Sequence, residues 1–216
     1  MLIILIKKEY ELVISFFQFL YLLIMKSSSI SSASQYRPKD FSEMIGQDAI
    51  VKTLSNAISN QKIPQALLFC GPRGVGKTSC ARILAKKIND LDENYEYNIF
   101  ELDAASNNSV EDIRNITEQI RIPPQYGRFK VYIIDEVHML SNAAFNAFLK
   151  SLEEPPPHVI FILATTEKNR IIPTILSRCQ IYDFKKVDNN SIISLLSKIC
   201  KEKKIKFDDS SLQIIA

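Results

Sequence analysis

Eight consecutive residues have the spacing of a phosphate-binding loop. They fit the pattern G-x-x-x-x-G-K-[ST] and are Gly71, Pro72, Arg73, Gly74, Val75, Gly76, Lys77 and Thr78. Glycine suits such a loop because the backbone must turn its N–H groups inward through conformations that side chains forbid. Lys77 would neutralise the β and γ phosphates, and the Thr78 hydroxyl would ligate Mg²⁺. The motif predicts nucleotide binding; a glycine-rich turn without a ligand is the alternative.

Two adjacent acids follow the apolar run 131–134. In a parallel sheet, Asp135 and Glu136 would lie at the carboxyl edge, where α/β proteins bind ligands and where the phosphate loop also lies. Asp135 would hold Mg²⁺ through its water shell, and Glu136 would orient and deprotonate an attacking water. Without the phosphate loop, the pair would be interpreted as two solvated acids. His138 is interpreted as a turn residue, with a catalytic role as the alternative.

The elements that must position these residues alternate along the chain. From Tyr36 onward, short apolar runs rich in β-branched residues alternate with segments of helical periodicity, which indicates a parallel sheet with helical crossovers. We therefore predict an α/β fold with one five-stranded, doubly wound parallel sheet and helices on both faces. The predicted strands are 66–70, 99–102, 131–135, 159–164 and 179–184, and the predicted helices are 48–60, 77–88, 110–120 and 143–152.

The charge and the cysteine spacing give no support for a nucleic-acid-binding, zinc-binding or disulfide-rich protein. The net charge of +3, from 27 basic and 24 acidic residues, is too small to indicate nucleic-acid binding by electrostatics alone. The four cysteines are far apart, so their spacing predicts neither a zinc knuckle nor a disulfide framework, and a reducing cytoplasm is expected.

The chain has three predicted parts: an apolar leader, 1–25, a nucleotide-binding domain, 26–184, and the beginning of a helical domain, 185–216. The leader contains two apolar runs, 1–6 and 12–25, and neither reaches the roughly 20 residues that a membrane-spanning helix needs. We interpret the leader as translated upstream sequence with Met25 as the true start; a membrane anchor and an export signal are the alternatives.

Several further motifs make the chain resemble the AAA+ clamp-loader ATPases, most closely the gamma/tau subunits of bacterial DNA polymerase III, from about residue 32 to the end. Besides the phosphate loop, the resemblance is carried by Tyr36-Arg-Pro38, Ile45-Gly-Gln47, Glu101-Leu-Asp-Ala-Ala-Ser-Asn107, Asp135-Glu-Val-His-Met-Leu140, Ala164-Thr-Thr-Glu167 and Ser177-Arg-Cys179.

The resemblance implies roles for individual residues. Thr165 would be the sensor that holds the nucleophilic water near the γ-phosphate, and Arg178 would act on the ATP of a neighbouring subunit. Such an arginine neutralises transition-state charge only when the ring is assembled, so hydrolysis would report on assembly. Tyr36 and Ile45 would pack against adenine.

The resemblance also implies cofactors and partners. These are ATP and Mg²⁺, the other subunits of a hetero-oligomeric loader ring, the sliding clamp and primed DNA, within a cytoplasmic DNA polymerase holoenzyme. No stable membrane association is expected. The chain would use ATP to place the clamp on DNA during replication.

The chain departs from this family in two ways. Members usually carry a four-cysteine zinc module after the helix of the phosphate loop, but residues 88–98 contain no cysteine, so no zinc is expected. Members also continue through a complete lid and a collar domain, and if the chain ends naturally at Ala216, closure over ATP and oligomerisation are in doubt. A nucleotide-binding scaffold without turnover, or another AAA+ DNA motor such as a branch-migration helicase, therefore remains an alternative.

Overall fold

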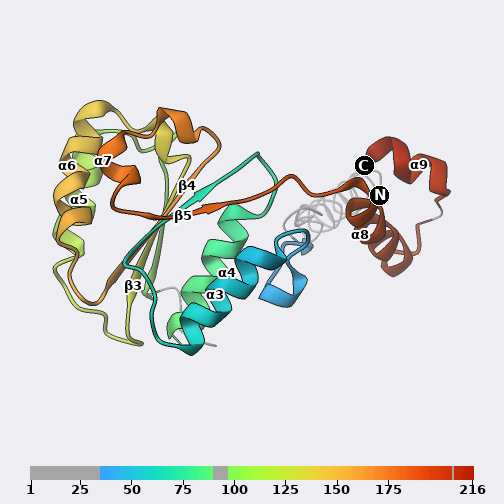
Figure 1. Ribbon diagram of the computed structural model, residues 1–216, viewed down its shortest axis with the longest axis horizontal. Helices are drawn as coiled ribbons and strands as arrows, with labels where there is room; N and C mark the ends of the chain where they lie inside the picture. The colour runs from blue at the N-terminus through green and yellow to red at the C-terminus, as the bar shows by residue number, and fades with distance from the viewer. Residues whose placement is uncertain (1–34, 90–96, 206) are drawn as a thin grey trace, which may run out of the picture. The chain divides into compact units, whose positions relative to one another are not determined.

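The structure is a computed structural model that describes residues 35–89, 97–205 and 207–216 (Figure 1). Contacts within the chain separate two units, Met1–Arg37 and Pro38–Ala216, and the sheet belongs to the second. The predicted leader, 1–25, lies outside the described residues, and the predicted domain boundaries stay predictions. No helix in the described ranges combines the length and the apolar character that crossing a membrane requires.

The second unit contains one five-stranded parallel sheet, as predicted. Its strands are β1 (Ala66–Cys70), β2 (Ile99–Asp103), β3 (Lys130–Asp135), β4 (Val159–Thr165) and β5 (Gln180–Asp183), in the order β2-β3-β4-β1-β5. The residues of β1 and β4 are buried throughout, which explains why these strands are continuous apolar runs in the sequence. Every predicted strand agrees with the structure to within one residue at each end.

Helices cover both faces of the sheet (Figure 1). One face carries α3 (Asp48–Ser59) and α4 (Lys77–Asn89), and the other carries α5 (Val110–Gln119), α6 (Asn142–Glu153) and the single turn α7 (Pro173–Leu176). Short 3₁₀ turns lie at η1 (Phe41–Glu43), η3 (Val137–Met139) and η4 (Lys168–Arg170). Two of the helix starts are fixed locally, because the Ser109 and Ser141 side chains cap α5 and α6.

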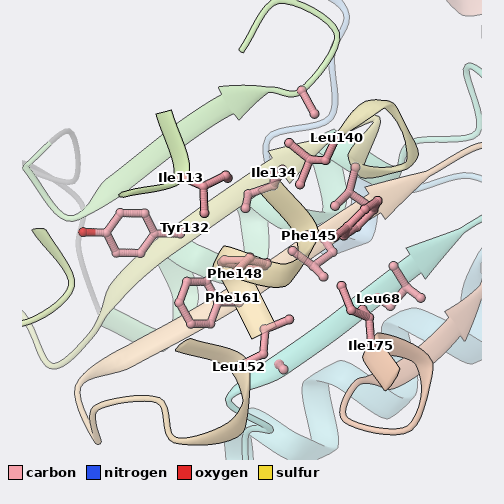
Figure 2. Close-up of a cluster of buried hydrophobic side chains, with 14 of the residues drawn as sticks. Leu68, Ile113, Tyr132, Ile134, Leu140, Phe145, Phe148, Leu152, Phe161 and Ile175 are labelled. Atoms are coloured by element: carbon pink, nitrogen blue, oxygen red, sulfur yellow. The ribbon is translucent and has the colours of Figure 1, made fainter. Parts of the chain in front are cut away.

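The core has two layers because successive strand residues point to opposite faces of the sheet. In β3, Tyr132 and Ile134 join the cluster under α5 and α6, which Figure 2 shows, whereas Val131 and Ile133 join the cluster under α3 and α4. In the first cluster, Phe148 of α6 meets an aromatic ring of β4 edge to face at 5.0 Å. The central strands are thus held on both faces, which fixes the position of their carboxyl ends.

Two helices follow β5. These are α8 (Asn189–Glu202) and α9 (Asp209–Ile215), and the side chains of Asp188 and Asp208 cap their first turns by accepting hydrogen bonds from backbone N–H groups. The two helices pack against each other. The predicted helical character of this segment is confirmed, and its assignment to a lid domain stays a prediction.

Candidate active site

The phosphate loop connects the end of β1 to the start of α4, which is the context that the motif requires. Its glycines are needed where the backbone passes close to other groups. At Gly71, with φ +150°, an added Cβ would lie 2.5 Å from the carbonyl oxygen of Phe184. At Gly76, with φ +98°, it would lie 2.8 Å from the Cε atom of Met44. At Gly71 a side chain would collide with backbone, and at Gly76 the flexible Met44 side chain could move but the positive φ would strain any residue other than glycine.

Lys77 turns its ammonium group back into the loop. Its Nζ atom donates to the carbonyl oxygens of Gly71 at 2.8 Å and Pro72 at 2.7 Å, and the residue is 6% exposed. Burial lowers the pKa of Lys77, while the carboxylates of Glu136 and Asp135 act in the opposite direction. The lysine is therefore a buried cation at the positive end of a helix dipole, where an anion would offset its desolvation.

Thr78 and Asp135 meet across the sheet edge. The Thr78 hydroxyl donates to Oδ2 of Asp135 at 2.6 Å, and the other carboxylate oxygen of Asp135 accepts from the backbone N–H of Glu136 at 2.9 Å. A hydroxyl and a carboxylate are hard oxygen ligands of the kind that Mg²⁺ uses together with water and nucleotide phosphates. Across the described ranges there is no cluster of three or more His, Cys, Asp or Glu side chains that could hold a metal without such added ligands.

Glu136 lies between the phosphate loop and the end of β4. Its backbone is left-handed, with φ 47° and ψ 43°. Its Oε2 atom accepts from the hydroxyl of Thr166 at 3.0 Å and from the backbone N–H of Thr166 at 3.3 Å. The guanidinium of Arg73, whose side chain is 90% exposed, lies 4.0 Å from Oε1. The carboxylate therefore faces both the loop and the strand end, where it can reach a water beside a bound phosphate.

Thr165 is expected to hold the nucleophilic water, but in the structure its hydroxyl contacts other protein groups. It is fully buried, and its hydroxyl lies 3.0 Å from Nδ1 of His138 and accepts from the backbone N–H of Glu167 at 3.0 Å. The neighbouring Thr166, rather than Thr165, contacts the carboxylate of Glu136. The sensor role of Thr165 stays a prediction.

Sequence reasoning missed two residues at this end of the sheet. His138 does lie in a turn, η3, but it is 7% exposed and has polar neighbours on both ring nitrogens. Thr166 belongs to one of the motifs, but the sequence assigns it no role of its own. The available signal was a pair of hydroxyl residues at the end of a wholly apolar strand, because such residues lie at the ligand edge of an α/β sheet.

Arg178 lies at the opposite edge of the sheet from the phosphate loop. It precedes β5, whose first residue, Gln180, pairs with Leu67 near the amino end of β1. Its guanidinium donates to Oε1 of Glu153 at 2.6 Å and to the carbonyl oxygen of Thr174 at 2.7 Å. A surface hollow of about 450 Å³ borders Arg178 and Glu153. The structure thus does not bring Arg178 together with the other site residues of the same chain.

The two predicted adenine contacts stay predictions. Tyr36 belongs to the unit Met1–Arg37, and Ile45, which is half-buried, belongs to the other unit. Beside Ile45, Met44 reaches Gly76 of the phosphate loop, and the Gln47 amide donates to the backbone carbonyl of Lys185 at 2.7 Å. The segment that contains Ile45 therefore lies along one side of the loop.

Comparison with protein families places these features in context. A family model described as "DNA polymerase III, delta subunit" matches residues 46–188. The chain is 46% identical over 198 residues to DNA polymerase III subunit tau of Bacillus subtilis, a match that covers 84% of this chain and 35% of that protein. It is 42% identical over 201 residues to the tau subunit of Escherichia coli, covering 85% and 31%. It is 41% identical to the gamma subunit of Buchnera aphidicola, covering 85% and 54%.

The solved structures agree in fold. The RuvB Holliday junction branch migration motor of Thermotoga maritima has a TM-score of 0.65 at 23% identity, over 83% of this chain and 59% of that chain. A DNA polymerase III gamma subunit-related protein from the same organism has a TM-score of 0.58 at 21% identity, over 70% and 53%. The chain spans between about a third and a half of the length of its curated relatives. The resemblance seen in the motifs is confirmed, and the chain belongs to the family of AAA+ clamp-loader proteins that includes the gamma and tau subunits of bacterial DNA polymerase III.

Proposed function

We propose that this chain is the ATP-binding and ATP-hydrolysing motor subunit of a bacterial sliding-clamp loader, which couples ATP to placing the clamp on primed DNA in the cytoplasm. The observation that supports this proposal most strongly is the convergence of four groups at one sheet edge. The Lys77 ammonium, the Thr78 hydroxyl and the carboxylates of Asp135 and Glu136 come from the two segments that the motifs single out. Each has the chemistry that phosphoryl transfer to water requires.

In this proposal the loop binds the phosphates and Glu136 acts on water. The loop N–H groups and Lys77 would hold the β and γ phosphates, and Thr78 and Asp135 would hold Mg²⁺. Bound Mg²⁺ would neutralise charge on the phosphate oxygens. Glu136 orients the attacking water and accepts its proton, and the contacts with Thr166 fix the direction of its carboxylate.

Arg178 would act on the nucleotide of a neighbouring subunit. Leu67, the partner of Gln180, precedes Gly71 by four residues, which is roughly 13 Å of strand. Arg178 therefore lies too far from its own phosphate loop to contact a γ-phosphate there. This separation supports assembly into a ring in which each active site is completed by another subunit.

The proposal is tested by measuring ATP hydrolysis by the protein assembled with the other loader subunits, with and without clamp and primed DNA. A motor subunit hydrolyses ATP faster when both are present, and the clamp becomes topologically linked to the DNA. A scaffold that binds nucleotide without turnover would bind ATP normally and show no hydrolysis in any mixture. That result would overturn the proposal while leaving the phosphate site in place.

A further inference from the structure

A buried histidine lies directly behind the proposed catalytic glutamate. The His138 side chain is 5% exposed, and both ring nitrogens have polar neighbours from the end of β4 and the segment that follows it. Nδ1 lies 3.0 Å from the hydroxyl of Thr165, and Nε2 lies 3.2 Å from Oε1 of Glu167. A buried imidazole requires polar partners, and here both come from the segment that also carries Thr166, the residue in contact with Glu136.

The polar partners connect His138 to the end of β4. The Glu167 carboxylate, which can only accept a hydrogen bond, lies 3.2 Å from Nε2. Nδ1 shares a hydrogen bond with the Thr165 hydroxyl, and its direction depends on the imidazole tautomer. That hydroxyl in turn accepts from the backbone N–H of Glu167 at 3.0 Å. Two hydrogen bonds of Thr165 and the 3.2 Å approach of Nε2 to Glu167 thus form a closed ring of contacts, the His138 ring.

The His138 ring joins two chain segments where the sheet no longer joins them. Between β3 and β4 the ladder ends at the pair Ile134 and Leu163, so Glu136 and Thr166 lie beyond its last pair. Glu136 also has a left-handed backbone, with φ 47°, which is strained for a residue with a Cβ atom. The His138 ring connects the turn after Glu136 to the segment that carries Thr166.

The same ring lies close to the carboxylate itself. Oε2 of Glu136 lies 3.4 Å from Nδ1 of His138 and accepts from the Thr166 hydroxyl at 3.0 Å. A change in the position of the imidazole would therefore let the carboxylate and its turn move relative to Thr166. A displacement of about 1 Å at a reacting group can reduce a rate about 100-fold.

We propose that His138 is a positioning residue for ATP hydrolysis, which fixes Glu136 relative to Thr166 through its contacts with Thr165 and Glu167. This inference rests on the proposed role of Glu136 as the base that activates water. His138 has no part in binding ATP, because its contacts lie with the end of β4 and its following segment rather than with the phosphate loop.

The test compares single-turnover ATP hydrolysis and equilibrium ATP binding in the full-length protein assembled with the other loader subunits. His138→Ala is expected to reduce the single-turnover rate about 10- to 100-fold and to change ATP affinity by less than about twofold. His138→Asn keeps an acceptor near Thr165 and should recover part of the rate. His158→Ala is the matched control, because that imidazole contacts the backbone carbonyl of Ile120 instead, and it should hydrolyse ATP at the wild-type rate.

A double variant shows whether His138 acts through Glu136. If it does, adding His138→Ala to Glu136→Gln causes no further loss of rate, because the group being positioned is already removed. A further loss equal to that in the wild-type background, or a wild-type rate for His138→Ala alone, would overturn the inference. A wild-type rate for Glu136→Gln alone would overturn the proposed function instead. If His138→Ala does not fold, Glu167→Ala, which removes the carboxylate 3.2 Å from Nε2 of His138, should show a loss in the same direction and the same lack of additivity.

Discussion

Replacing Arg178 by alanine is expected to separate nucleotide binding from hydrolysis. Arg178 is separated from its own phosphate loop by roughly 13 Å along the direction of β1, so ATP binding to the isolated subunit should be unchanged. Its ion pair with Glu153 joins side chains that are 34% and 45% exposed. Such exposed pairs contribute only about 0–1 kcal/mol, so the variant should fold and its Tm should change little.

Hydrolysis in the assembly should respond far more strongly. An arginine supplied by a neighbouring subunit accelerates phosphoryl transfer about 10³- to 10⁵-fold, or about 4–7 kcal/mol. To reach that position, Arg178 must leave Glu153, which costs at most about 1 kcal/mol, or about fivefold in rate. The loss in the assembled Arg178→Ala variant should therefore be at least about 10²-fold. Glu153→Gln, which frees the arginine, should raise the assembled rate by no more than about fivefold.

The assay measures ATP affinity of the isolated subunit and single-turnover hydrolysis by the assembly. Arg114→Ala is the matched control, because it removes another exposed arginine, 3.8 Å from Glu111, at a distance from the site. Mixing Arg178→Ala and Lys77→Ala subunits should restore part of the activity. The Arg178→Ala subunit supplies an intact phosphate loop, and the Lys77→Ala subunit supplies the arginine. Equal losses in the isolated subunit and in the assembly would contradict the proposed role, because Arg178 would then act within its own chain.

The remaining predictions concern the loop, pH and metal content. Lys77→Ala should weaken ATP binding by about 2–5 kcal/mol, because triphosphate binding loses a buried cation, and unchanged affinity in an equilibrium titration would exclude the phosphate site. The hydrogen bond from Lys87 lowers the pKa of Asp40 to about 2. This exposed pair adds at most about 1 kcal/mol to the free energy of unfolding. The contribution is fully present above about pH 4, the unfolded pKa, and is lost as the pH falls through about 2. Asp40→Asn should therefore lower stability in chemical unfolding at pH 7 and have a much smaller effect at pH 2. Elemental analysis after dialysis should find no stoichiometric zinc, since the described residues contain no group of three or more His, Cys, Asp or Glu side chains that could hold it; one retained zinc per chain would contradict this.

Much of the fold could be predicted from the sequence because its signals are local. Strand and helix bounds follow from periodicity, and the helix that begins at Lys77 follows directly from the phosphate-loop motif. The pairing of Thr78 with Asp135 could also be anticipated, since both come from segments that reach the same edge of a parallel sheet. These features need only the chain order and the rule that ligands bind at carboxyl ends of strands.

The rest depends on contacts between segments that are distant in sequence. The position of His138 against Thr165 depends on where β3 and β4 end relative to each other, which no local pattern records. The same holds for Arg178 and Glu153, which meet only because α6 ends beside the start of β5. Composition and spacing carry no information on such contacts, so they predict a turn for the buried histidine and no partner for the arginine.

The proposed role of Glu136 is tested most directly by single-turnover ATP hydrolysis of Glu136→Gln, measured together with its ATP affinity in the assembled loader. Glutamine keeps an oxygen that can accept from Thr166 and removes only the base. A catalytic base at Glu136 predicts wild-type affinity within about twofold and a rate at least about 100-fold lower. A wild-type rate with wild-type affinity would contradict it, because another group would then have to activate the water.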